Sequence, residues 1–494
     1  MSPIVVVRDV AYELANGREL FKNLSFPLSA VRSALVGPNG VGKTTLARLI
    51  AGELEPTHGS IQRHGPVKVF AQRQQPQAIT VAEFLADRHE WSLTRERLLA
   101  NIDRQALCTQ LSGGQWTRVR LAQALEDGFL ILDEPTNDLD RDGREAVRQF
   151  LQAHTGGVLL ISHDRECLEL CDDILELSNT GLMKFGGNWH DYVIEKERER
   201  TRLTSALDQA KRERDAAIEH RFEQRERQEK RNRRGVKAAA RGDIPRIVAG
   251  GRKRQAQVTS GKRDTALVNR AEAAVHKARE ALSQVKVDPV MYADLLGHEL
   301  PAQKLVAEAD GFNIRFNDWI FATDVDFAWR GNVRIALKGA NGSGKSTLLK
   351  ALMGTLFETR GHLNRGNLVT LYLDQRGSVL DEDASVLDNI RAVSADNESG
   401  IRNDLARFLF AGDAVFQKVR DLSGGERVRA ALARGLLGTQ KPELMLLDEP
   451  TNNLDLANIE FLENVVAQFH GALIVVSHDQ RFLDNCGIDA EFVL

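Results

Sequence analysis

The sequence predicts an α/β fold that is built twice in one chain, with a helical segment between the two copies. The first observation is a repeated pair of segments: Leu-Ser-Gly-Gly followed by Asp-Glu-Pro-Thr-Asn occurs at residues 111–137 and again at 422–452. The second is a glycine-rich loop that precedes each pair, at residues 37–44 and 339–346. The third is the stretch between the copies, residues 191–304, which begins with residues that are almost all charged or small. Segments that recur in one order indicate two copies of one domain.

The composition is that of an ordinary soluble protein. The 494 residues, 42% hydrophobic and 27% charged, leave room for about three domains. No apolar stretch approaches the roughly 18 residues that a membrane span needs, and the N-terminus lacks the pattern of a signal peptide. Cys167 and Cys171 have no second pair to complete a zinc site, so we expect buried thiols. These features predict a cytoplasmic protein.

The first unit, residues 1–190, begins with two short strands, at 4–10 and 24–28, on either side of an Asn-Gly turn. The apolar run at 33–36 leads into the glycine-rich loop, and residues 46–51 have helical character. A strand, a glycine-rich loop and a helix in this order are the context of a Walker A motif, which binds nucleotide phosphates. The loop residues predicted to bind are Gly37, Pro38, Asn39, Gly40, Val41, Gly42, Lys43, Thr44 and Thr45.

The chemistry of this loop predicts a nucleotide and Mg²⁺ as ligands. Backbone N–H groups and the helix N-terminus cradle phosphates, Lys43 reaches the β- and γ-phosphates, and the Thr44 hydroxyl ligates Mg²⁺. One match to this pattern would arise by chance in roughly a few per cent of chains of this length. Two matches in equivalent contexts make chance negligible.

The buried run at 129–132 ends in two carboxylates, Asp133 and Glu134. Beside a phosphate-binding loop, Asp133 can hold Mg²⁺, and Glu134 can orient and polarise the attacking water. The alternative, a solvated acidic turn, is disfavoured because the pair recurs in the second unit.

Two further polar residues follow strands of the first unit. The apolar strand at 158–161 is followed by His163. A single histidine at a strand end is usually structural, but this one has a twin in the second unit, which indicates a contact with the γ-phosphate. Gln72, after the strand-like residues 67–71, would alone be interpreted as a surface polar residue.

The segment at 191–304 is predicted to contain two long antiparallel helices. Leu203, Leu207 and Ala210 form a thin apolar stripe in the first. In the second, at 265–287, apolar residues recur at three- and four-residue steps, which is typical of a helix with a narrow packed seam. These residues are Leu267, Ala271, Ala274, Ala278, Leu282 and Val285.

Between these helices the charge is strongly positive. Residues 221–263 contain 15 Lys and Arg against four Asp and Glu, a net charge of +11, which leaves −14 for the rest of a chain whose total is −3. A solvated tip is the plain alternative, but an excess of one sign at the end of a helical hairpin favours salt-sensitive contact with phosphates. Phe222 is the one aromatic residue of this block, so the backbone of folded RNA is a better predicted partner than stacked bases.

The second unit, residues 305–494, repeats the first. Residues 312–316 resemble the first strand, and the strand at 334–338 leads into the second loop. Lys338 is a charge in a strand predicted to be buried, without an explanation in the sequence. We expect no further domain, because the sequence ends at Leu494. The equivalent site residues are Gly339, Ala340, Asn341, Gly342, Ser343, Gly344, Lys345, Ser346 and Thr347 in the loop, then Gln375, Ser423, Gly425, Asp448, Glu449 and His478.

Each unit therefore has a phosphate-binding loop, a glutamine, Leu-Ser-Gly-Gly, an Asp-Glu pair and a histidine in one order. This order resembles the ATP-binding cassette (ABC) superfamily from end to end. The resemblance implies an α/β fold with two P-loop NTPase ABC cassettes joined by a basic α-helical hairpin linker. It also implies that the cassettes close head to tail, with each ATP between the loop of one and the Leu-Ser-Gly-Gly of the other. A serine and two glycines at a helix N-terminus do form an anion site.

The resemblance assigns residues to two ATP sites. The first would combine Lys43, Thr44, Gln72, Asp133, Glu134 and His163 with Ser423 and Gly425 of the other cassette. The second would combine Lys345, Ser346, Gln375, Asp448, Glu449 and His478 with Ser112 and Gly114. The catalytic residues would be Glu134, His163, Glu449 and His478, and the Mg²⁺ ligands Thr44, Gln72, Asp133, Ser346, Gln375 and Asp448. For stacking on adenine, Phe316 suits the second cassette, whereas Tyr12 and Leu14 remain alternatives in the first.

A narrower resemblance is to the ABC-F proteins, tandem cassettes that act on the ribosome. A charged helical linker joins the cassettes, and Phe-Gly-Gly-Asn-Trp-His-Asp-Tyr at 185–192 is similar to the family's Tyr-x-Gly-Asn-Tyr-x-x-Tyr. The resemblance implies binding at the tRNA exit site, with the linker contacting tRNA and ribosomal RNA near the peptidyl-transferase centre. Lys43 and Ser112 are only 69 positions apart, which leaves little room for the extra arm of some members. A long linker without that arm resembles members that relieve stalling or protect ribosomes from antibiotics.

We therefore predict a monomeric ATPase whose two cassettes close on ATP and reopen on hydrolysis, with no membrane subunit. One alternative is the energy subunit of a membrane transporter, and a second is a DNA-repair ATPase, because phosphate contacts alone do not separate DNA from RNA. A non-enzymatic scaffold is disfavoured by the presence of both Glu134 and Glu449.

Overall fold

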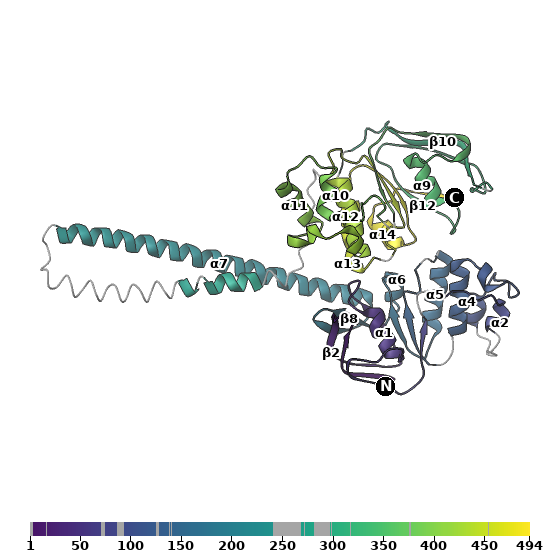
Figure 1. Cartoon of the computed structure of the whole chain (residues 1–494), viewed down its shortest axis with the longest axis horizontal. Coiled ribbons are helices and arrows are strands. Elements are labelled where there is room, and N and C mark those ends of the chain that lie inside the picture. The colour runs from purple at the N-terminus through teal and green to yellow at the C-terminus, as the bar shows by residue number, and fades with distance from the viewer. Residues whose placement is uncertain are drawn as a thin grey trace. The chain divides into compact units, whose positions relative to one another are not determined.

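The computed structural model describes residues 3–15, 17–70, 75–85, 93–124, 128–137, 139, 141–240, 268–270, 272–280, 297, 299–316, 318–374, 377–452 and 454–494. The chain forms two compact units, one made of residues 1–192 and 289–494, and the other of residues 193–288 (Figure 1). The first unit contains both predicted cassettes, and the second contains most of the predicted linker. Gln72, Gln375 and the basic residues 241–263 lie outside the described residues.

The first cassette has two sheets. An antiparallel sheet has the order β2-β1-β4, and a six-stranded sheet has the order β5-β6-β7-β3-β8-β9, parallel except for β9. The strands are β1 (Val5–Glu13), β2 (Glu19–Leu28), β3 (Arg32–Val36), β4 (His58–Arg63), β5 (Val67–Phe70), β6 (Phe129–Asp133), β7 (Val158–Ile161), β8 (Asp173–Ser178) and β9 (Gly181–Gly186). The helices are α1 (Lys43–Ala51), α2 (Val81–Leu85), α3 (Leu93–Leu98), η1 (Cys108–Gln110), α4 (Gly113–Ala124), α5 (Arg141–Ala153) and α6 (Arg165–Leu168).

The second cassette, green to yellow in Figure 1, has the same plan. Its antiparallel sheet has the order β11-β10-β13, and its parallel sheet has the order β14-β15-β16-β12-β17. The strands are β10 (Leu305–Arg315), β11 (Val325–Arg330), β12 (Arg334–Lys338), β13 (Glu358–Arg365), β14 (Thr370–Leu373), β15 (Leu444–Asp448), β16 (Ala472–Val476) and β17 (Ala490–Val493). The helices are α9 (Lys345–Met353), α10 (Val386–Arg391), α11 (Glu398–Arg407), η3 (Gly412–Phe416), η4 (Val419–Asp421), α12 (Gly424–Leu436), α13 (Leu456–Ala467) and α14 (Gln480–Asn485).

The central parallel strands are continuous apolar runs because both of their faces are covered. Every residue of β6, β7, β15 and β16 is buried, as expected for strands with helices on each side. Their carboxyl ends meet at one edge of each sheet, which is where ligands bind in open α/β sheets. The glycine-rich loop, the Asp-Glu pair and the histidine all follow such strands, so the fold brings them together.

The charged segment contains one long helix, α7 (Trp189–Ala240), drawn in teal in Figure 1. Leu207 and Ala210 of its apolar stripe are buried. Residues 268–270 and 272–280 are also helical, and Lys277 there donates to Glu213 of α7 at 2.7 Å. The prediction of two α/β cassettes with a helical insertion is thus confirmed. In the part of the chain that the structure describes, no helix combines the length and hydropathy of a membrane span.

Lys338 does not contradict a buried strand, because it stands at the end of β12. Its side chain is 25% exposed, and its Nζ donates to Glu491 Oε1 at 2.5 Å and to Gln480 Oε1 at 3.2 Å. The charge is therefore paired at the edge of the sheet.

Candidate nucleotide-binding sites

The first glycine-rich loop borders a cavity of about 440 Å³. Gly42, which precedes α1, has a φ of 105°, a region that residues with a Cβ rarely adopt. The turn places the buried Lys43 ammonium inside the loop, where it donates to Gly37 O at 2.7 Å and Pro38 O at 3.2 Å. The cavity is lined by Leu14, Arg18, Leu20, Asn39, Gly40, Gly42, Lys43, Thr44, Thr45, Asp133, Glu134, Asn137, Ile161 and His163.

The second loop has the same construction. Gly344 precedes α9 with a φ of 95°, and the Lys345 ammonium donates to Gly339 O at 2.8 Å and Ala340 O at 2.9 Å. Both loops therefore hold a lysine ammonium against loop carbonyls, at the N-terminus of a helix where phosphates bind favourably.

The predicted Mg²⁺ ligands of each loop and strand lie together. Ser346 Oγ donates to Asp448 Oδ1 at 2.8 Å, and in the first cassette the Thr44 side chain hydrogen-bonds Asp133. A hydroxyl and a carboxylate held side by side are oxygen donors that suit Mg²⁺. Tyr372, which sequence reasoning did not select, donates its hydroxyl to Asp448 Oδ2 at 3.1 Å.

The two glutamates have the same strained backbone. Glu134 and Glu449 both have a φ of 47°, and a residue other than glycine held there costs about 1–3 kcal/mol. The strain turns each side chain toward its histidine: Glu134 Oε1 lies 3.3 Å from His163 Nε2, and Glu449 Oε1 lies 3.3 Å from His478 Nε2. Each pair is mostly buried. The arrangement places a carboxylate and an imidazole beside each phosphate-binding loop.

Burial determines the protonation of these groups. It raises the pKa of Glu134 to about 8 and the pKa of Glu449 to about 7. It lowers the pKa of His163 to about 3, with a further lowering from the nearby Lys43 charge. Glu134 therefore lies beside a neutral imidazole, and this contact is not an ion pair. A buried carboxyl that titrates near neutral pH suits a general base.

The serine of each Leu-Ser-Gly-Gly segment caps a helix. Ser423 Oγ accepts from Glu426 N, and Ser423 N donates to Glu426 Oε2 at 2.9 Å, which completes a capping box on α12. Ser112 and Gln115 make the equivalent pair of bonds at the N-terminus of α4. These contacts orient the helix N-terminus as an anion site requires.

The pairing of each segment with the opposite loop stays a prediction. Among the described residues, those that line the first cavity all belong to the first cassette, and Ser423 and Gly425 are not among them. A contact between cassettes exists beside this cavity: Asn39 N donates to Asp455 Oδ2 at 2.9 Å. Asp455 caps the N-terminus of α13 and also accepts from the Asn458 side chain at 2.6 Å.

Of the two residues predicted as alternatives for the first cassette's adenine contact, one lines the cavity of the glycine-rich loop. Leu14 lines the cavity, whereas Tyr12 is not among its lining residues and has its ring 6.5 Å from that of Phe21. In the second cassette, Phe316 is 62% exposed, with its ring 5.6 Å from that of Phe357.

Comparisons with known proteins agree with this architecture. The family model described as ABC transporter matches residues 21–137 and 322–452. ATP-binding protein Uup of Buchnera aphidicola subsp. Schizaphis graminum is 30% identical over 98% of this chain and 79% of its own length. Probable ATP-binding protein YheS of Escherichia coli K12 is 28% identical over 93% and 74%.

Two solved structures share the fold. They are the archaeal ribosome recycling factor aABCE1, in complex with the ribosomal stalk protein aP1, and RNase-L Inhibitor. Each is 18% identical and covers 98% of this chain and 87% of its own, with TM-scores of 0.58 and 0.59. At this identity the likeness concerns the fold alone.

Proposed function

Because the chain belongs to the ABC-F family of ATP-binding cassette proteins, we propose that it binds the ribosome and modulates translation through its interdomain linker. As a tandem-cassette protein of this family it is an ATPase. The observation that carries the proposal is the insertion between the cassettes, with the 52-residue helix α7 and a net charge of +11 over residues 221–263. We assign residues 1–190 and 305–494 to the cassettes and 191–304 to the linker.

Within each cassette, the chain's own residues bind ATP and prepare the attacking water. Lys43 and Lys345 hold the phosphates together with the N–H groups of their loops. Glu134 and Glu449, kept beside the γ-phosphate position by their strained backbone, accept a proton from the water, and the adjacent histidines contact the γ-phosphate. Mg²⁺, held by Thr44 and Asp133 or by Ser346 and Asp448, neutralises charge on the phosphates when bound.

ATP acts as the switch between two arrangements of the cassettes. Each Leu-Ser-Gly-Gly segment supplies an anion site that is used only when the opposite cassette brings its γ-phosphate. ATP therefore binds the closed arrangement better than the open one, and hydrolysis removes that preference. The linker, which begins in α7 directly after the first cassette, follows this motion.

The linker's chemistry favours folded RNA. In the described part of α7, several cations are paired within the helix, such as Arg227 with Glu223 and Lys230 with Glu226. Arg233 and Arg234 are exposed. Neutralising several phosphates gives binding that weakens steeply with salt. From the resemblance to ABC-F proteins we propose that the protein binds at the tRNA exit site and that its linker contacts tRNA and ribosomal RNA near the peptidyl-transferase centre. The short first cassette favours relief of stalling or protection from antibiotics over other roles.

The decisive experiment traps the closed state. Glu134→Gln and Glu449→Gln together should retain ATP binding but abolish most hydrolysis. In a cell lysate with ATP, the double variant should sediment with ribosomes and inhibit translation, whereas without ATP it should not. Protein that stays at the top of the gradient would overturn the ribosome proposal, and protein in the membrane pellet would favour a transporter subunit.

The linker is tested with a matched pair of variants. Replacing the exposed Arg233 and Arg234 by Gln should weaken ribosome binding at least about threefold at physiological salt and leave ATPase activity unchanged. Replacing Arg198 and Arg200 by Gln is the control, because these arginines of the same helix pair with Glu195 and Glu197. Equal effects of the two pairs would contradict a localised RNA contact.

A further inference from the structure

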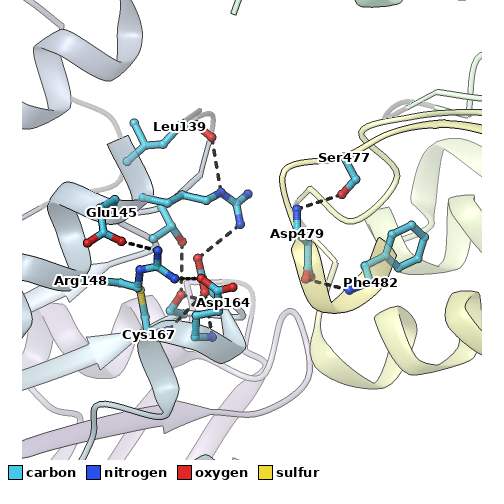
Figure 2. A network of polar contacts seen from close by, with 12 residues as sticks. Leu139, Glu145, Arg148, Asp164, Cys167, Ser477, Asp479 and Phe482 are labelled. Atoms are coloured by element: carbon cyan, nitrogen blue, oxygen red, sulfur yellow. Dashed lines mark hydrogen bonds and ion pairs between the residues drawn. The ribbon is translucent and has the colours of Figure 1, made fainter. Parts of the chain in front are cut away.

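The turns that follow the two catalytic histidines are built in the same way. In the second cassette Asp479 caps α14, and its Oδ1 accepts from Phe482 N at 3.0 Å. In the first, Asp164 caps α6, and its Oδ1 accepts from Cys167 N at 3.3 Å. Figure 2 shows both turns with their bonds as dashed lines. The cassettes differ instead at the predicted Mg²⁺ ligands.

The two aspartates that would bind Mg²⁺ do not have the same hydrogen-bond donors. Both are buried and both accept a bond from the hydroxyl of their loop: Ser346 Oγ donates to Asp448 Oδ1 at 2.8 Å, and the Thr44 side chain bonds Asp133. Asp448 has a second donor, because the Tyr372 hydroxyl lies 3.1 Å from its Oδ2. Each oxygen of the Asp448 carboxylate therefore accepts a side-chain bond.

Tyr372 stands where the first cassette has Val69. Tyr372 of β14 pairs with Leu446 of β15, and Val69 of β5 pairs with Ile131 of β6. Leu446 and Ile131 each precede the aspartate of their strand by two residues. Tyr372 and Val69 both pack, partly buried, against the hydrophobic core of their own cassette. Because a valine side chain has no polar atom, the first cassette cannot make this bond from the same position.

A donor on each carboxylate oxygen fixes the rotation of the Asp448 side chain. An ionised carboxylate only accepts, so the Tyr372 hydroxyl is the donor. Mg²⁺ requires oxygen ligands in near-ideal octahedral geometry, and hydrogen bonds to a ligating carboxylate orient it. Loss of such a partner typically costs about 10–100-fold in metal affinity or activity.

We propose that Tyr372 is a positioning residue of the second Mg²⁺ site, where its hydroxyl holds Asp448 in the orientation that binds the ion. The first site has Val69 at this position and needs a higher Mg²⁺ concentration to fill. The two ATP sites therefore differ in metal affinity. The inference rests on the proposed role of Asp448 as a Mg²⁺ ligand and not on ribosome binding.

The first test measures metal binding by electron paramagnetic resonance, with Mn²⁺ in place of Mg²⁺ and ATP equimolar to purified full-length protein. Glu134→Gln and Glu449→Gln together prevent most hydrolysis, and Asp133→Asn confines Mn²⁺ to the second site. In this protein, Tyr372→Phe should raise the Mn²⁺ concentration at half-saturation about tenfold, and Asp448→Asn should weaken binding at least as much. If Asp448→Asn had no effect, the proposed ligand role of Asp448 would be wrong. If Tyr372→Phe alone had none, the inference on Tyr372 would be wrong.

The matched control is made at the first site. With Asp448→Asn in place of Asp133→Asn, the bound Mn²⁺ lies in the first cassette. Tyr372→Phe should then change the Mn²⁺ concentration at half-saturation less than about twofold. The phenylalanine ring keeps the packing of Tyr372, so an equal weakening at both sites would show a general effect on the fold and would overturn the proposal.

A second test separates metal binding from packing. In the Glu134→Gln protein, where the second site hydrolyses ATP, Tyr372→Phe should raise the Mg²⁺ concentration for the half-maximal rate about tenfold. At saturating Mg²⁺, kcat should stay within about twofold, because excess metal compensates for weak binding but not for defective packing. A lower kcat at every Mg²⁺ concentration, without a change in the Mg²⁺ concentration required, would contradict the positioning role.

Discussion

At the scale of single residues, Glu134 and Glu449 share a backbone conformation and a histidine partner but differ in pKa, at about 8 and about 7. The active form is the carboxylate, so each site loses activity as the pH falls through the pKa of its glutamate. Glu449→Gln leaves the Glu134 site, and Glu134→Gln leaves the Glu449 site. We expect kcat/KM to be half-maximal at a higher pH for Glu449→Gln than for Glu134→Gln, because kcat/KM reports groups of the free enzyme. Coincident pH profiles, or profiles in the reverse order, would contradict these assignments.

Sequence reasoning could find the residues whose chemistry requires a fixed spacing. The lysines and hydroxyls of the two loops and the Asp-Glu pairs that follow the buried strands belong to this group, because phosphate binding needs those residue types in that order. It could not find the left-handed backbone at Glu134 and Glu449, since no side-chain type signals that strain. It also could not find Arg165, which belongs to no motif and whose partner Glu463 lies 298 residues away in the other cassette.

At the scale of elements, the strands β3 and β12 both begin with an arginine, but the two arginines have different partners. Arg334 donates to the carbonyls of Val466, Phe469 and Cys486 at 2.7–2.9 Å, at the ends of α13 and α14. Arg334→Met removes all three donors, which should destabilise this region by about 2–4 kcal/mol. Amide hydrogen exchange in α13 and α14 measures that loss directly, because it reports local opening.

The control for this substitution is Arg32→Met in the first cassette. Arg32 pairs with Asp172, whose side chain is 43% exposed, so water replaces the lost partner. An exposed pair contributes about 0–1 kcal/mol. If both variants lost similar protection from amide hydrogen exchange, the ends of α13 and α14 would not be stabilised specifically by the bonds from Arg334.

The ends of the strands were harder to predict than the strands themselves. The run at 158–161 coincides with β7, because its apolar residues are continuous. The expected strand at 312–316 instead begins at Leu305 in β10. Gly311, with a φ of 55°, lies where the register of β10 shifts against both neighbours. A glycine in a strand allows such a bulge, but in the sequence it resembles a break.

At the scale of the whole molecule, the repeat predicts two cassettes but not the contacts that join them. Arg165 Nη1 lies 2.6 Å from Glu463 Oε1, with side chains 5% and 10% exposed. In the repeat, Arg165 corresponds to Gln480 and Glu463 corresponds to Arg148. Gln480 and Arg148 cannot form an ion pair. Arg148 instead contacts Glu145 and Glu166 of its own cassette. The interface between the cassettes is therefore asymmetric in this ion pair.

This asymmetry makes a prediction about closure. We expect the Arg165–Glu463 pair to persist when the cassettes close on ATP. Glu463→Gln, which leaves the Arg165 guanidinium buried without its partner, should then cost about 3–5 kcal/mol in the closed arrangement. With fluorescent labels on the two cassettes of the Glu134→Gln, Glu449→Gln protein, the ATP concentration for half-maximal closure should rise at least about tenfold. Replacing Arg165 and Glu463 together by Met should restore much of the loss, since no buried charge is then unpaired. Arg148→Met, at the position equivalent to Glu463, should not affect closure, and an equal effect there would show that the Arg165–Glu463 pair does not hold the cassettes together.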